Sequence, residues 1–424
     1  MTAENPQGMP LIPIFFNLFS GLHLWLIKIL KVIPVVGPPM SDLLSQVPME
    51  IIYYSTFVIL AFLVTQAVAL IGGIMTFLER RIAGRIQFRI GPNRVGPQGI
   101  LQFLADGIKL ILKEDLIPDE ADKPLFRIAP YLVVVGTFLA FVCLPITSTV
   151  ILSDINMGIF YILAVTSFVV IGIIMSGWAS NSKWSLLGAL RSAAQIIAYE
   201  IPVGLAVLAV IFYSGSLSMQ EIIQSQGAWP WQWNMFANPF LLISVFIYFT
   251  GALAENNRTP FDIPEAESEL VSGYNTEYSG IRFGFFFMAE FANVFLISAI
   301  CTTLFLGGWN IPFQVSHPLL KNILEASVFL LKSGILVFLV LQLRWTLPRL
   351  RVDQLMSACW KYLVPIAFMN ILGTTLWMVL WPKGIWWVKG LLTLFIAAVV
   401  INFIRHVFRN LKAVSGTIRW NPLS

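Results

Sequence analysis

Long apolar runs, separated by shorter polar segments, recur along the whole chain. A run of about 20 apolar residues is long enough to cross a bilayer as a helix. Such runs predict an all-α, polytopic transmembrane helical bundle of about nine spans, at residues 51–78, 126–146, 156–177, 186–212, 239–254, 284–307, 325–347, 358–381 and 385–408. A further apolar stretch, 11–36, is interrupted by Lys28 and Lys31, and it is either a tenth span or a helix in the membrane interface.

The composition agrees with a membrane protein. Apolar residues make up 57% of the 424 positions and charged residues 12%, against roughly a quarter charged residues in soluble domains. Segments that alternate over about ten residues, typical of outer-membrane barrels, do not occur. Three widely spaced cysteines, Cys143, Cys301 and Cys359, each lie within an apolar run, and the chain has no CxxC or HExxH motif. We therefore expect the cysteines to be small apolar core residues, and no metal or cluster held by this chain alone.

The loops between the runs fall into two sets that differ in charge. Lysine and arginine are concentrated in segments 80–123 and 344–351 and in the tail after residue 404, whereas the alternate loops 147–155, 213–238 and 308–319 contain neither. By the positive-inside rule the basic set faces the cytoplasm or the matrix, and only Lys383 and Lys389 lie on the other side. The N-terminus lacks an Arg/Ser-rich transit pattern, which favours a bacterial plasma membrane over a mitochondrial inner membrane. Nothing in the net charge of +5 indicates nucleic-acid binding.

Several ionisable residues lie inside the predicted spans. Glu200 follows Arg191 in span 186–212, Glu290 lies in span 284–307, and Glu255 ends span 239–254. A further pair, Glu325 and Lys332, is spaced to share one face of span 325–347. A charge at mid-bilayer costs about 2.5–3.5 kcal/mol on insertion scales, so it often marks an ion path. The alternative is a set of structural ion pairs, but the matching intramembrane cations are scarce, which favours a proton path.

The loop 255–282 is unusually acidic. Its six carboxylates are Glu255, Asp262, Glu265, Glu267, Glu269 and Glu277, against Arg258 and Arg282. Pro264 fits the first turn of a short helix capped by Asp262, which would align Asp262, Glu265 and Glu269 on one face. Crowded carboxylates raise one another's pKa, so such a cluster can hold and pass protons. A solvated acidic loop and a cation site fit the spacing equally well, but the self-repulsion of an acidic loop between nearly charge-free spans favours a functional cluster.

The loop 78–115 is basic and rich in turn residues. Gly91, Pro92 and Asn93, then Gly96 and Pro97, predict tight turns. Apolar positions repeat at helical spacing over 101–112, which predicts an amphipathic helix lying against lipid or a docked protein. The arginines of this loop bind either lipid phosphates or a partner subunit, and they are Arg80, Arg85, Arg89 and Arg94.

These loops resemble the signature segments of the H subunit of bacterial respiratory complex I, which is equivalent to mitochondrial NADH dehydrogenase subunit 1. The resemblance is carried by LERRIAGRIQFRIGPNRVGPQG with LADGIKLILKED, ENNRTPFDIPEAESELVSGYNTEYSG, MAEF at 288–291, and LRWTLPRLRVDQLM followed by WKYLVP. It covers residues 50–382 and makes them the expected family core. Residues 1–49 are then an N-terminal extension, and 383–424 hold an additional helix and a basic tail.

The resemblance implies a role in an NADH:quinone oxidoreductase that translocates protons. A quinone, with ubiquinone favoured, would enter a chamber shared with two peripheral subunits on the iron–sulfur side, while NADH, FMN and the iron–sulfur clusters belong to partners. Small and antiporter-like subunits would pack laterally, among membrane lipids. Residues that match the chamber are Thr76, Glu79, Arg80, Asp106 and Lys109, with Phe287 and Met288 near its opening. Residues that match the carboxylate path are Glu200, Glu255, Asp262, Glu265, Glu267, Glu269, Glu277 and Glu290. A basic loop under the peripheral arm is matched by Arg344, Arg349 and Arg351.

The sequence leaves three other functions open. The membrane subunit of an energy-converting hydrogenase shares the acidic loop, although the full Glu-Arg-Arg and Gly-Pro-Asn-Arg-Val-Gly-Pro stretch favours quinone chemistry. An independent proton-coupled transporter would show repeated halves with broken helices, and the sequence has no such repeat. A purely structural anchor would leave the clustered carboxylates unexplained.

Overall fold

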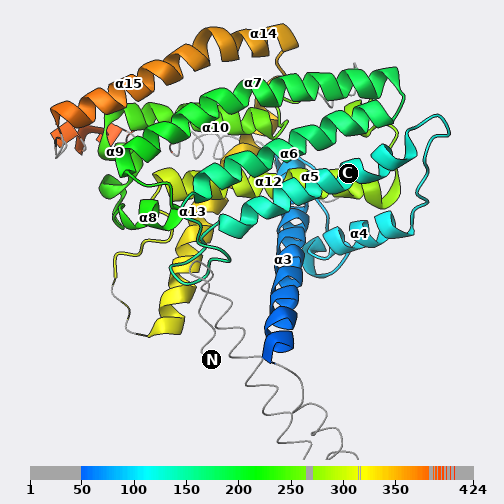
Figure 1. Ribbon diagram of the computed structural model, residues 1–424, viewed down its shortest axis with the longest axis horizontal. Helices are drawn as coiled ribbons and strands as arrows, with labels where there is room; N and C mark the ends of the chain where they lie inside the picture. The colour runs from blue at the N-terminus through cyan, green and yellow to red at the C-terminus, as the bar shows by residue number, and fades with distance from the viewer. Residues whose placement is uncertain are drawn as a thin grey trace, which may run out of the picture.

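The computed structural model describes residues 49–263, 271–313, 315, 317–381 and 385, with isolated positions between 387 and 405. Across these residues the regular structure is helical and contains no strand (Figure 1). The long helices are α3 (Met49–Ile86), α5 (Lys123–Ala140), α6 (Gly158–Ala179), α7 (Lys183–Ser214), α10 (Pro239–Glu255), α12 (Gly280–Phe305), α13 (Pro318–Thr346) and α15 (Val364–Leu380). The short ones are α4 (Gln102–Leu112), α8 (Met219–Gln224), α9 (Asn234–Ala237), α14 (Val352–Ser357) and the π-helix η5 (Ala358–Leu363), with 3-10 turns η1 (Pro97–Gly99), η2 (Phe141–Cys143), η3 (Pro230–Gln232) and η4 (Gly273–Asn275).

The predicted all-α membrane fold is confirmed. Seven helices of the described residues are long and apolar enough to cross a membrane, and α10 is a shorter apolar helix. Together they match the first eight predicted spans. Most of the ninth, 385–408, lies outside the described residues, and so does the apolar stretch 11–36.

Two helices extend beyond the apolar runs that predicted them. Helix α3 continues through Glu79, Arg80 and Arg81 to Ile86, because these charged residues end the apolar run but are good helix formers. Helix α13 begins at Pro318 rather than near residue 325, since proline is well placed at the first turn of a helix. Apolar length alone therefore underestimates helices whose ends reach past the bilayer core.

The helices α5, α6 and α7 pack side by side through small residues. A Cβ atom built on Gly172 of α6 would lie 2.6 Å from Val133 of α5, and one on Gly177 would lie 2.2 Å from Ala189 of α7. Small residues let helix backbones approach closely where no hydrophobic effect drives association. Helix α12 crosses behind this layer and packs against α3, α5 and α13, and most of its apolar segment is buried (Figure 1).

The π-helix η5 supplies a hydrogen-bond donor to α7 where a proline interrupts the hydrogen bonds of that helix. Pro202 has no N–H, which leaves the carbonyl of Ala198 without its usual helical donor. The Cys359 thiol of η5 donates to that carbonyl over 3.0 Å, and the Tyr199 hydroxyl donates to the Leu355 carbonyl over 3.0 Å. All three cysteines are free and buried, as expected, and Cys359 has this additional hydrogen-bonding role.

The two sets of loops lie at different ends of the bundle. Helix α4 lies at the right of Figure 1, and α8 and α9 lie at its left. Near the end of α3, the backbone N–H of Leu350 donates to the carbonyl of Pro260 over 3.0 Å, which joins the basic segment 344–351 to the start of the acidic loop. We call this region the basic end, and we call the region of loops 215–238 and 306–313 the opposite end.

Candidate functional site

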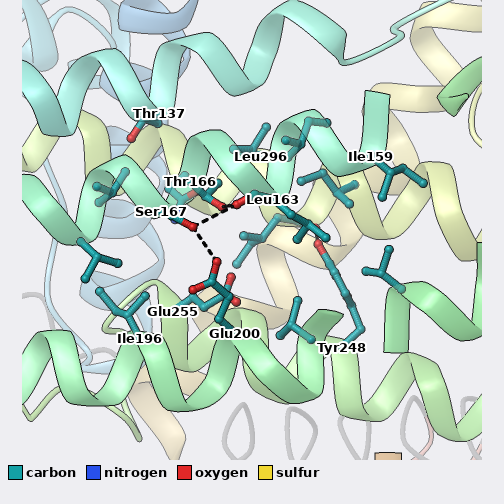
Figure 2. Close-up of a pocket in the computed structure, with 18 of the residues that line it drawn as sticks. Thr137, Ile159, Leu163, Thr166, Ser167, Ile196, Glu200, Tyr248, Glu255 and Leu296 are labelled. Atoms are coloured by element: carbon teal, nitrogen blue, oxygen red, sulfur yellow. Dashed lines mark hydrogen bonds between the residues drawn. The ribbon is translucent and has the colours of Figure 1, made fainter. Parts of the chain in front are cut away.

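Glu200 and Glu255 line one internal cavity of about 50 Å³ (Figure 2). Glu200 projects from α7 beside Pro202, and Glu255 is the last residue of α10. The Ser167 hydroxyl of α6 lies 2.7 Å from Oε1 of Glu200 and donates to it. The remaining wall is mainly apolar and includes Ile196, Leu163 and Leu296, so the two carboxylates share one small, largely apolar space.

A second cavity of about 30 Å³ extends from Glu255 to Glu290. It shares Thr137, Asn293 and Glu255 with the first, so the two cavities adjoin along the same helices. Each volume exceeds the roughly 10–15 Å³ that a single water molecule requires, and each contains several polar groups. The pair of cavities can therefore hold short water chains between three carboxylates that lie on three different helices.

Arg258 joins this carboxylate series to α3. Its side chain is 1% exposed and lies among the carboxylates, with Nε 3.0 Å from Oε1 of Glu290 and Nη1 donating to Oε2 of Glu79 over 2.9 Å. The guanidinium also stacks 4.3 Å from the ring centroid of Phe291. The planar, delocalised guanidinium suits this role, because it can pair with two carboxylates at once and still contact an aromatic face.

The network continues to the basic segment of the chain. Arg344, near the end of α13, forms a second ion pair with Glu79. Arg349 donates from Nη2 to Oδ2 of Asp262 over 2.9 Å, and its side chain is 39% exposed. The series thus runs from a half-exposed surface pair to carboxylates inside the helix bundle. Arg351 precedes α14 as its N-cap residue.

The residues matched to the quinone chamber lie where α3, α4 and α12 meet. A Cβ on Gly72 would lie 3.0 Å from the carbonyl oxygen of Met288, so α3 and α12 touch here. Thr76 is half-buried one turn further along α3, and Arg80 forms an ion pair with Asp106 of α4. The other chamber candidates are the exposed Lys109 of α4 and the half-buried Phe287 of α12, whose ring lies near those of Phe283 and Phe291.

Other candidates lie apart from the series. Glu277 is half-buried in the turn between η4 and α12, away from both cavities. Glu325 accepts hydrogen bonds from the backbone and hydroxyl of Ser148, and Lys332 bonds to carbonyls at the end of α12, so this pair serves the opposite end. Glu265, Glu267 and Glu269 lie outside the described residues, as does the predicted short helix after Asp262.

Sequence reasoning missed Arg258 as a member of the site. It had counted only as a cation opposing the acidic loop, and nothing in its local pattern indicates that it folds inward. The polar cavity residues Ser167, Thr137 and Asn293 were also missed. Asn293 could have been found, because it lies three positions after Glu290 and therefore on the same helix face.

The arrangement is suited to moving protons. Carboxylates separated by water-sized cavities can exchange protons through bridging waters, while Arg258 compensates the charge of Glu290 and of the neighbouring Glu79. Among the described residues, no group of three or more potential metal ligands lies together.

Known proteins resemble this chain over most of its length. A family model described as NADH dehydrogenase matches residues 57–375. A protein from Anaeromyxobacter dehalogenans, named as the H subunit of an NADH-quinone oxidoreductase, is 48% identical over 394 residues, covering 88% of this chain and 95% of that protein. Proteins of the same name from Chlorobium luteolum and Phocaeicola vulgatus are 47% and 43% identical, covering 72% and 78% of this chain and 84% and 93% of their own lengths.

Proposed function

The chain belongs to the NADH dehydrogenase family as a membrane subunit of an NADH-quinone oxidoreductase, and we propose that it couples quinone reduction to proton translocation. In this proposal the basic end, around Thr76, Glu79, Arg80, Asp106 and Lys109, forms part of the quinone chamber. Phe287 and Met288 lie near its opening. Glu290, Glu255 and Glu200, which continue from Arg258 into the helix bundle, form the path that couples the reaction to proton movement within the membrane.

One observation carries the proposal. A chamber candidate, Glu79, and a path candidate, Glu290, share the same buried guanidinium. Any change of charge at Glu79 alters the pairing of Arg258, and so it alters the compensation available to Glu290. The quinone chamber and the carboxylate path are therefore linked by a single side chain that pairs with a residue of each. Coupling between two sites requires that a change at one alters the contacts at the other, and Arg258 can supply this.

The chemistry of the chain's own residues follows from this link. Reduction of a quinone to a quinol consumes two electrons, supplied by cofactors of partner subunits, and two protons. Removal of protons near the chamber makes the basic end more negative, and Arg258 then pairs more strongly with Glu79. Glu290 is left less compensated, which favours proton uptake at Glu290 from the cavities that it shares with Glu255 and, through Glu255, with Glu200.

Neutralising Glu290 tests this coupling. In the intact complex, Glu290→Gln should abolish most NADH:quinone turnover and proton pumping, while NADH oxidation by a soluble acceptor at the peripheral subunits is retained. Glu120→Gln, in the exposed loop before α5, is the matched control and should leave both activities unchanged. The proposal is wrong if the Glu290→Gln complex reduces quinone and pumps protons normally. The same test extends to Glu265, Glu267, Glu269 and Glu277, which we also propose for the path.

The exposed charges of the basic end and the exposed apolar faces of the helices support proposals about partners and location. The exposed arginines of the basic end suit two peripheral subunits of the iron–sulfur side, and the exposed apolar faces of α13 and α15 suit lipid and lateral membrane subunits. We further propose that the basic end faces the cytoplasm of a bacterial cell, with ubiquinone as the quinone. The relatives described above are all named for quinone reduction, so they give no support to a hydrogenase or transporter function.

A further inference from the structure

At the opposite end, the loop 215–238 reaches the first cavity through its helix α8. Met219, the first residue of α8, lines the cavity and is 1% exposed. The next turn of α8 contributes Ile222 and Ile223, both fully buried. A layer of buried apolar side chains therefore separates Glu200 and Glu255 from the aqueous phase at this end. An apolar layer of this kind resists wetting, and continuous water is what conducts protons.

Gln226 fastens this loop to the end of α12. Its side chain is 4% exposed, and Nε2 donates to the carbonyls of Thr303 over 2.9 Å and of Ile222 over 3.2 Å. Its Oε1 accepts from the backbone N–H of Asn234 over 3.1 Å and of Gly307 over 2.9 Å. Both ends of one amide thus bridge the loop and the helix terminus.

Neighbouring side chains complete the same contact. Asn310 donates from Nδ2 to the carbonyls of Ile223 and Gln226, over 2.8 and 2.6 Å. Asn234 donates to the carbonyl of Leu304 over 3.0 Å. We call Gln226, Asn234 and Asn310 the amide knot. The amide knot satisfies carbonyls at the C-terminus of α12, so these carbonyls are no longer available to bind water.

A cation lies beside the amide knot. Lys332 of α13 donates to the carbonyls of Leu306 and Gly308, over 2.7 and 3.0 Å, and its ammonium lies 4.7 Å from the centroid of the Trp233 ring. Carbonyls at a helix C-terminus carry partial negative charge and favour a cation there. A fixed positive charge next to a narrow passage also repels protons, as in selective pores.

We propose that the loop 215–238 is a proton-tight plug that closes the carboxylate path toward the opposite end. Gln226 holds the loop in place, and Lys332 of α13 supplies a fixed positive charge beside it. The inference rests on the proposed function, because only a proton path needs such a barrier. Gln226 and Lys332 are positioning residues in this account: neither meets the transported proton. A plug would oblige protons at Glu200 to leave sideways rather than straight across this chain.

The passive proton conductance of the resting complex tests the plug. The purified whole complex is placed in proteoliposomes without NADH or quinone, a potassium diffusion potential is imposed, and internal pH is followed with a trapped dye. Gln226→Ala and Lys332→Met should each raise proton entry several-fold. Gln220→Ala, on the same loop but outside the knot, should behave as wild type. Lys332→Arg, which keeps the charge, should leak less than Lys332→Met.

A double variant separates a path-specific leak from general damage. If Gln226→Ala opens the carboxylate path, adding Glu200→Gln should return the conductance toward the wild-type value. A leak that persists in the double variant, or unchanged conductance in both single variants, overturns the plug. Neither outcome depends on turnover, so the plug can fail while the proposed function stands. Conversely, normal pumping by Glu290→Gln would remove the proposed function without changing these conductances.

The unaltered complex provides a test that does not depend on assembly of a variant. Hydrogen exchange should be slow for backbone amides in 219–226, because the knot protects α8 as part of the core. The loop 144–157 at the same end should exchange faster. Equally fast exchange in both segments in the wild-type complex contradicts a closed plug.

Discussion

The two ends of the carboxylate series are built from different chemistry. At the basic end, Glu290, Arg258 and Glu79 form a chain of full charges in which one cation serves two anions. At the opposite end, Gln226 occupies a comparable central position but is neutral, and both ends of its amide are hydrogen-bonded. A shared cation can shift toward either partner when a charge changes, whereas a saturated amide has nothing to exchange. The contrast indicates that one end responds to the reaction and the other resists it.

The largest effect is expected at Arg258. Arg258→Met removes the ion pair of Glu290 and one of the two ion pairs of Glu79, whose other partner is Arg344. Breaking a buried pair in this way costs about 3–5 kcal/mol. We expect loss of quinone reduction together with a lower thermal midpoint of the complex. Arg258→Lys keeps a charge but cannot pair with both carboxylates in the same geometry, so it should retain stability better than activity. Thermal unfolding and NADH:quinone assays on both variants separate these effects, and equal losses in the two variants would argue against a bridging role.

A smaller effect is expected at the exposed margin of the same network. Arg349 pairs with Asp262 but is 39% exposed, and pairs of this kind contribute roughly 0–1 kcal/mol because solvent screens them. Arg349→Gln should therefore reduce quinone turnover by a few-fold at most without loss of assembly. The wild-type rate should also fall toward the variant rate as salt is raised, since screening weakens the same pair. A variant as inactive as Arg258→Met would show that the surface pair, not the buried one, controls the response.

The sequence predicts those features of the two ends that depend on local patterns, and it does not predict those that depend on how distant segments pack. The helices were predicted because apolar runs report bilayer insertion directly, and Glu200 and Glu290 were found because carboxylates within such runs are unusual. Arg258 was not found, since its burial depends on how the chain turns after α10. The amide knot was missed for a related reason: Gln226, Asn234 and Asn310 lie in polar loops, where such residues ordinarily face water. The burial of Arg258 and the burial of the amide knot both depend on contacts between distant segments rather than on local propensity.

The smallest expected effect comes from a carboxylate of the opposite end that lies near the plug without belonging to the knot. Burial, and then the nearby Glu221 carboxylate, raise the pKa of Asp154 above its ordinary value, although a hydrogen bond from Ser218 partly offsets this. Because its folded pKa is raised, Asp154 adds stability at low pH that is lost as pH rises through that folded pKa.

Asp154→Asn should remove this loss, so hydrogen exchange in 144–157 and 219–226 should be slightly slower than wild type at about pH 8, and the difference should be smaller at about pH 5, closer to the ordinary aspartate pKa. The difference should be small, because Asp154 remains accessible to screening solvent. Passive proton conductance should be unchanged at both pH values, since neither Gln226 nor Lys332 is altered. If conductance instead follows the protonation of Asp154, the opposite end responds to charge as the basic end does, and the contrast between a responsive and a resistant end would not hold.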